Sequence, residues 1–144
     1  MSAKAVAETG VLFRTIDIAG ESYRYAVYVP RDYDAAREWP CVVFLNGSGE
    51  CGRDGQKHLG VGLLPAIMIK GEEWPCVVVF PQKPTVKSEW EDHEALVLGA
   101  LDASRKEWKI DAKRIALTGL SQGGHGTWVL GSRHPELFSR IAPL

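Results

Sequence analysis

The sequence Gly-Leu-Ser-Gln-Gly at residues 119–123 constrains this chain more than any other segment. A short apolar run, residues 114–118, precedes it, and residues 122–133 can form a helix. This order predicts a strand, a sharp turn and a helix, with Ser121 at the turn. The two glycines leave no Cβ where a tight turn brings backbones together. The pattern is that of a nucleophile elbow, which exposes a serine hydroxyl beside a helix N-terminus that favours negative charge.

The length and composition are those of an ordinary globular domain. The chain has 144 residues, of which 45% are hydrophobic and 24% charged, and its net charge is −1. We therefore expect a single domain over residues 1–144, with residues 1–9 as a disordered start. No basic stripe suits nucleic acid, and no apolar run approaches the length of a membrane span. We expect neither nucleic acid nor a membrane as a partner.

Three cysteines bear on the cellular compartment. Cys41, Cys51 and Cys76 are odd in number and lack the spacing of metal ligands. Reduced thiols in the cytoplasm are the simplest interpretation, and no metal site is expected. The first residues contain no long apolar core, so we expect no signal peptide and a cytoplasmic protein.

The N-terminal third predicts a hairpin. Residues 11–19 and 22–30 read as two strands, and the second alternates Tyr23, Tyr25, Val27 and Val29 with other residues. A Gly-Glu pair between the two runs supplies the turn. An antiparallel hairpin is therefore expected at the start of the sheet.

The rest of the chain alternates strands with helices. Residues 39–44 and 74–80 are continuous apolar runs that each open with Trp-Pro-Cys, as buried parallel strands do. The other expected elements are helices at 63–69, 89–109 and 122–133, a strand at 114–118 and the beginning of a strand at 138–143. This order predicts an α/β fold with a mainly parallel sheet and right-handed crossovers.

Several segments together carry a family resemblance. They are residues 45–50 followed by Gly52, residues 80–82 with Trp90, residues 114–126 with Trp128, and residues 134–138. On these the chain resembles the α/β-hydrolase superfamily, and most of all its branch of feruloyl esterases, polyhydroxybutyrate depolymerases and predicted peptidases. The resemblance runs from Gly10 to Leu144 and departs from the usual pattern at Asn46, where histidine is usual, and at Cys51, where arginine is usual. It implies an α/β-hydrolase fold that lacks its C-terminal strands.

The resemblance also implies a chemistry. Ser121 would be the nucleophile that cleaves a small-molecule carboxylic ester through an acyl-enzyme. The oxyanion would be held by the backbone N–H groups of Gln122 and Ser48, with Gly49 as the alternative to Ser48. No cofactor is implied.

None of the four histidines stands where the catalytic base of this fold is expected. In this fold the acid and the histidine follow the serine along the chain. His58 and His93 precede Ser121, while His125 and His134 lie on its own helix or at that helix's end. We therefore expect the acid and base beyond residue 144, an incomplete domain of low activity, and an open sheet edge that promotes self-association.

Several alternatives stay open at this point. Glu50 and Asp54 could bind substrate or orient the loop, or be solvated charges. Cys51 could be a nucleophile, although no histidine is predicted beside it. The chain could be a non-catalytic binding module on the same scaffold, or a peptidase or thioesterase that uses the same mechanism.

Overall fold

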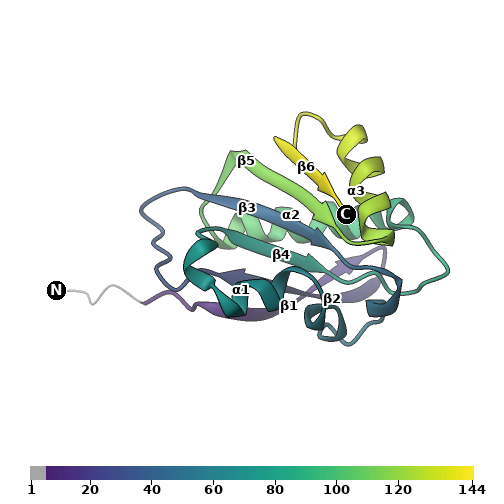
Figure 1. The fold of residues 1–144 in the computed structure, drawn as a ribbon, viewed down its shortest axis with the longest axis horizontal. Helices are drawn as coiled ribbons and strands as arrows, with labels where there is room; N and C mark the ends of the chain where they lie inside the picture. The colour runs from purple at the N-terminus through teal and green to yellow at the C-terminus, as the bar shows by residue number, and fades with distance from the viewer. Residues whose placement is uncertain (1–5) are drawn as a thin grey trace.

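A computed structural model describes residues 6–144 as one six-stranded mixed sheet with helices on both faces (Figure 1). The strands are β1 (Gly10–Ile18), β2 (Glu21–Val29), β3 (Trp39–Leu45), β4 (Val77–Pro81), β5 (Ile110–Gly119) and β6 (Arg140–Pro143). The α-helices are α1 (Leu63–Ile69), α2 (Glu94–Glu107) and α3 (Gln122–Arg133). Short 3-10 turns are η1 (Ser48–Glu50), η2 (Lys57–Gly60), η3 (Gly71–Glu73) and η4 (Trp90–His93).

Residues 6–9 are exposed and belong to no helix or strand. The remainder of the predicted disordered start, residues 1–5, lies outside the described residues.

The strand order is β1-β2-β4-β3-β5-β6. The β1–β2 hairpin is antiparallel, with Gly10 opposite Val29, and β2 pairs antiparallel with β4. The strands β4, β3, β5 and β6 are mutually parallel. The predicted α/β class, with a mainly parallel sheet and an N-terminal hairpin, is therefore confirmed.

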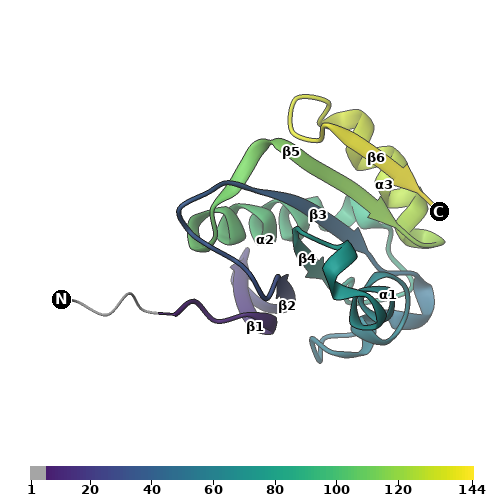
Figure 2. The same cartoon turned by 60° about the vertical axis from the view of Figure 1, so that its left-hand side comes forward.

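The crossovers decide which face each helix covers. The chain moves from β3 to its neighbour β4 through α1, and then back across β3 to β5 through α2. Right-handed connections that run in opposite directions along a sheet place their helices on opposite faces. Accordingly α2 and α3 cover one face and α1 the other, as the two views in Figures 1 and 2 show. The chain leaves β3 toward one face of the sheet and leaves β4 and β5 toward the other.

Strand β2 is more deeply buried than its alternating pattern suggests. All residues from Tyr25 to Val29 are buried. Tyr25, Val27 and Val29 join the core under α2 and α3, whereas Ala26 and Tyr28 join the core under α1. The strand lies inside the sheet, between β1 and β4, and the cores on both faces of the sheet reach this stretch. Side chains on both faces of β2 are therefore buried.

Several predicted boundaries move, and the strand expected at 114–118 runs from Ile110 to Gly119. Two of the shifts have a reason in the local backbone chemistry. The expected helix over 89–109 is a 3-10 turn, η4, followed by α2 from Glu94. A reciprocal capping box between Glu89 and Asp92 sets the start of η4. The strand expected from residue 74 begins only at Val77, since Pro75 lacks an N–H and restricts the residue before it.

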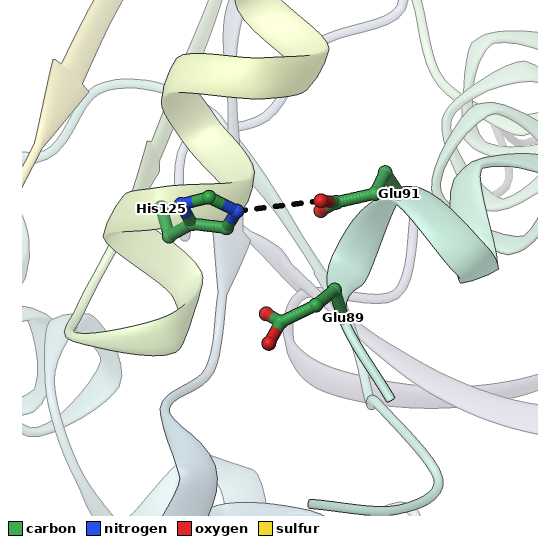
Figure 3. Close-up of side chains that lie close together, drawn as sticks. All are labelled: Glu89, Glu91 and His125. Atoms are coloured by element: carbon green, nitrogen blue, oxygen red, sulfur yellow. Dashed lines mark hydrogen bonds and ion pairs between the residues drawn. The ribbon is translucent and has the colours of Figure 1, made fainter. Parts of the chain in front are cut away.

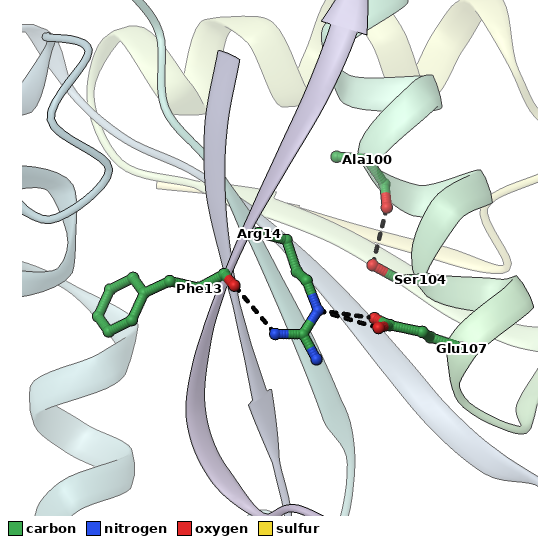
Figure 4. Close-up of polar contacts among 5 residues, drawn as sticks. All are labelled: Phe13, Arg14, Ala100, Ser104 and Glu107. Atoms are coloured by element: carbon green, nitrogen blue, oxygen red, sulfur yellow. Dashed lines mark hydrogen bonds and ion pairs between the residues drawn. The ribbon is translucent and has the colours of Figure 1, made fainter. Parts of the chain in front are cut away.

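A surface contact ties α2 to the hairpin (Figure 4). The Nε of Arg14 on β1 lies 2.9 and 3.0 Å from the two carboxylate oxygens of Glu107. The same guanidinium lies 5.5 Å from the centroid of the Trp108 ring. Within α2, Ser104 Oγ donates to Ala100 O. The contacts of Arg14 with Glu107 and Trp108 hold the end of α2 over β1.

No helix in the part of the chain that the structure describes is both long and apolar enough to cross a lipid bilayer.

Candidate active site

Ser121 lies in a sharp turn between β5 and α3. The strand ends at Gly119 and the helix begins at Gln122, so the predicted strand, turn and helix are confirmed. Ser121 has φ 58° and ψ −114°, a conformation that costs a non-glycine residue on the order of 1–3 kcal/mol. The serine is exposed at the carboxyl end of the sheet.

Backbone hydrogen bonds brace this turn from both sides. Leu120 N donates to Leu45 O, at the end of β3, over 3.2 Å. Ser121 N donates to Leu144 O, just after β6, over 2.9 Å. The strained serine is therefore held by the two strands that flank β5, and the surrounding fold maintains the conformation.

Glycine is required where the turn packs on β3. A Cβ added at Gly123 would lie 1.9 Å from Leu45 O, and one added at Gly119 would lie 2.3 Å from Gly123 O. Both contacts are with backbone atoms, which cannot rotate away. The turn can approach β3 this closely only because both positions lack a side chain.

The loop after β3 lies against the turn. Gly47 precedes η1, and a Cβ at Gly47 would lie 3.6 Å from Ser121 Cβ and 3.0 Å from Glu50 Oε2. The next residue, Ser48, is exposed and is the first residue of η1. The fold therefore brings the loop that carries Ser48 beside Ser121.

The two residues that depart from the family pattern contact each other. Asn46 is only 1% exposed, and its Nδ2 lies 3.7 Å from Cys51 Sγ. Its Oδ1 accepts from Lys83 N over 3.1 Å, and its backbone O accepts from Trp90 Nε1 over 3.0 Å. Asn46 is thus a structural tie between the loop and the segment after β4. Its amide contacts the Cys51 thiol, so the two residues that differ from the usual family pattern are neighbours in the folded loop.

Asp54 orients the loop. Its carboxylate accepts hydrogen bonds from Gln56 N and Lys57 N, each over 3.0 Å, and from Gln82 Nε2 over 3.1 Å. These donors, the two backbone N–H groups foremost, lower the pKa of Asp54 to about 2. Of the three roles considered for Asp54, these bonds favour orientation of the loop by a carboxylate that is also exposed to solvent.

Each of the four histidines bonds to a partner other than the Ser121 hydroxyl. His125 Nε2 lies 3.3 Å from Glu91 Oε1, and His134 Nε2 lies 2.6 Å from Glu94 Oε1. The remaining contacts are His93 Nε2 to Ser88 Oγ at 2.7 Å and His58 Nε2 to Phe80 O at 2.9 Å. Burial lowers the pKa of both His58 and His93. His125 is thus directed at Glu91 of η4.

One group of side chains could offer ligands to a metal (Figure 3). Donor atoms of Glu89, Glu91 and His125 all lie within 4.8 Å of one another, between η4 and α3. Glu89 also belongs to the capping box of η4, and Glu91 pairs with His125. These interactions account for the arrangement as a link between η4 and α3.

The three cysteines are free thiols. Cys41 and Cys76 are buried, and burial raises the pKa of both, that of Cys76 to about 11. Cys51 Sγ contacts Gly47 O at 3.6 Å in addition to Asn46. Its neighbours give it no base, and its contacts are those of a structural residue.

Sequence reasoning assigned no role to Gln82 and Lys83, two buried polar residues directly after β4. Their position was the available signal, because residues at the carboxyl ends of parallel strands meet at the edge where such sheets bind ligands.

Neither a protein-family model nor a curated protein matches the sequence. Solved structures do match the fold. A thermostable esterase aligns with a TM-score of 0.80 and 33% identity over 92% of this chain and 40% of that one. The feruloyl esterase module of Clostridium thermocellum, complexed with sinapinate, has a TM-score of 0.72 and 18% identity over 92% and 52% of the two chains. A fluorophosphonate-binding serine hydrolase of Staphylococcus aureus has a TM-score of 0.69 and 14% identity over 95% and 57%.

The sheet order, the turn at Ser121 and the match at 33% identity show that the chain has the α/β-hydrolase fold. The structures that share this fold with it include esterases. The chain spans between 40% and 57% of the length of these three structures and corresponds to their N-terminal portion.

Proposed function

We propose that residues 1–144 form the nucleophile-bearing part of a serine esterase that works through an acyl-enzyme. The observation that carries the proposal is Ser121, an exposed serine with φ 58° in the turn between a buried strand and a helix. Strained residues persist where a fold over-determines them, and such positions cluster at active sites. The turn is accordingly a nucleophile elbow.

Two backbone N–H groups beside the serine would form the oxyanion hole. Gln122 is the first residue of α3 and Ser48 the first of η1, so neither N–H has a partner within its own helix or turn. Gly47 brings the two segments together at the serine. Donors of this kind stabilise the negative charge that develops on a carbonyl oxygen, and removal of one such donor costs about 10²–10³ in kcat.

The chemistry would proceed in two acyl transfers. Ser121 Oγ forms a bond to the ester carbonyl carbon, its proton passes to a general base, and the carbonyl electrons move to the oxygen. Collapse of this intermediate breaks the bond to the alcohol, which leaves with the proton. Water then repeats the sequence on the acyl-serine and releases the acid.

The base and the acid that orients it are proposed to come from polypeptide other than residues 1–144. The histidines of the described chain bond to Glu91, Glu94, Ser88 and a backbone carbonyl. A peptide or thioester substrate would use the same groups, and the proposal prefers carboxylic esters on the strength of the 33% identity to an esterase.

A fluorophosphonate probe tests the proposal on the chain as it stands. We expect slow, stoichiometric labelling at Ser121. The proposed oxyanion donors lie within residues 1–144, whereas the proposed general base lies outside them. Peptide mapping after proteolysis would locate the label, and Ser121→Ala is the control that should lose it. A folded protein with unlabelled Ser121 would contradict the proposal and favour a non-catalytic binding module.

We further propose that the isolated chain self-associates. Strand β6 lies at the edge of the sheet, and beside it an apolar groove of about 580 Å³ opens on the face that carries α1. Phe44, Leu120 and Ile141 are among its lining residues. Unpaired strand edges and apolar grooves promote association. Sedimentation velocity should show dimers or larger species at micromolar concentration, and Ala142→Lys, at an exposed residue that lines the groove, should shift the distribution toward monomer. A monomeric wild-type chain would contradict this expectation.

A further inference from the structure

Gln82 follows directly on β4 and is only 2% exposed. Its Nε2 donates to Glu50 O over 3.2 Å and to Asp54 Oδ1 over 3.1 Å. Its Oε1 accepts from Gly55 N over 2.8 Å. A side-chain amide has two N–H donors and one carbonyl oxygen, and all three functions are used here. These partners all lie in the segment that follows β3, between 27 and 32 residues away in sequence.

The backbone of Lys83 extends the same contact. Lys83 N donates to Asn46 Oδ1 over 3.1 Å, and Lys83 O accepts from Gly52 N over 2.9 Å. The Lys83 side chain turns elsewhere, because its ammonium donates to the carbonyl oxygens of Thr85 and Ser88. Residues 82–83 thus hold the loop over residues 46–55 at several points along its length.

The loop is held internally by Asn46 Nδ2, which donates to Gly47 O over 2.7 Å, but the turn that carries Ser48 is closed only by long bonds. Within η1, Glu50 N donates to Gly47 O over 3.3 Å and Cys51 N to Ser48 O over 3.4 Å. Both distances are at the long end for N–H···O bonds, so the turn is weakly closed. The bond from Gln82 to Glu50 O attaches the last residue of this turn to the end of a buried strand.

We propose that Gln82 is a positioning residue that holds the Ser48 N–H in place for the oxyanion. This inference rests on the proposed function, in which the Ser48 N–H is an oxyanion donor. Gln82 acts through Glu50 and the loop, and it does not contact the reacting atoms. A misplacement of about 1 Å at such a donor is enough to cost on the order of 10²-fold in rate.

The test measures loop order and serine reactivity in the same 144-residue protein. Gln82→Met removes all three hydrogen bonds with a side chain of similar length. We expect backbone ¹⁵N order parameters at Ser48 and Gly49 to fall from about 0.85 to below about 0.6. Labelling of Ser121 by the fluorophosphonate should slow by about 10²-fold, the loss expected when one oxyanion donor is misplaced.

Lys83→Met is the matched control. It changes the neighbouring buried side chain but keeps the backbone bonds to Asn46 and Gly52, so it should leave the order parameters at Ser48 and Gly49 unchanged. If Gln82→Met does not fold, Gln82→Glu replaces it: the carboxylate keeps the bond to Gly55 N, loses both donations, and should loosen the loop in the same way.

The outcomes separate the two proposals. Order parameters that match the wild type in a folded Gln82 variant would overturn the positioning role, as would an equal loss in Lys83→Met. A wild-type protein whose Ser121 does not label would count against the esterase, and the order parameters would still decide whether Gln82 positions the loop.

Discussion

The Ser121→Ala substitution is expected to lower ester turnover by about a millionfold, the cost typical of losing a triad nucleophile. The measurement needs a protein that supplies the acid and the base. A chimera of residues 1–144 with the C-terminal portion of the thermostable esterase, its 33% identical neighbour, would serve, with hydrolysis of a p-nitrophenyl ester as the assay. The oxyanion donors would remain, so a residual acceleration of about a thousandfold over water is expected.

Stability provides the control for this variant. Alanine keeps the strained φ of 58° at position 121, whereas glycine adopts such values readily. Ser121→Ala should therefore fold as the wild type does, and Ser121→Gly should be more stable by about 1 kcal/mol in urea unfolding while equally inactive. Near-normal hydrolysis by either variant would refute the nucleophile.

Gly123→Ala is expected to destabilise the domain by at least about 3 kcal/mol, which is a large part of the usual 5–15 kcal/mol. The added Cβ would lie 1.9 Å from Leu45 O and 2.9 Å from Asn46 O. Neither backbone oxygen can move without displacing the end of β3 or the start of α3. The turn at Ser121 depends on both, so reactivity toward the fluorophosphonate should also be lost.

Gly49→Ala is the matched control for this steric argument. Gly49 lies in the neighbouring loop, and a Cβ there meets nothing within 4 Å. Its free energy of unfolding should stay within about 0.5 kcal/mol of the wild type. Equal stability of Gly123→Ala and Gly49→Ala would show that the packing of α3 on β3 is looser than described.

The turn at Ser121 was predictable from local sequence. A run of apolar residues, glycines at 119 and 123 and the following helical segment determine a strand, a turn and a helix within about twenty residues. The bounds of α1 and α3 agree with the prediction for the same reason, because apolar spacing and helix-ending residues are written into the segment itself.

Contacts between residues far apart in the sequence could not be predicted from local patterns and became visible only in the tertiary structure. The pairing of β2 with β4 buried residues 25–29 on both faces, although their alternation alone predicts one exposed side. The role of Gln82 depends on Glu50, Asp54 and Gly55, which reach it only because β3 and β4 are neighbouring parallel strands.

The candidate site likewise combines residues that the sequence could nominate with contacts that only the tertiary structure revealed. Sequence pattern and family resemblance sufficed to nominate Ser121, Ser48 and Gln122, since each stands at the end of a recognisable strand. They could not determine what holds the loop of Ser48, or that Asn46 and Cys51 touch. The contacts that hold the loop depend on the order of strands in the sheet, which follows from burial of the whole core and is not encoded in any one segment. Asn46 and Cys51 are only five residues apart, and the folded loop brings their side chains into contact.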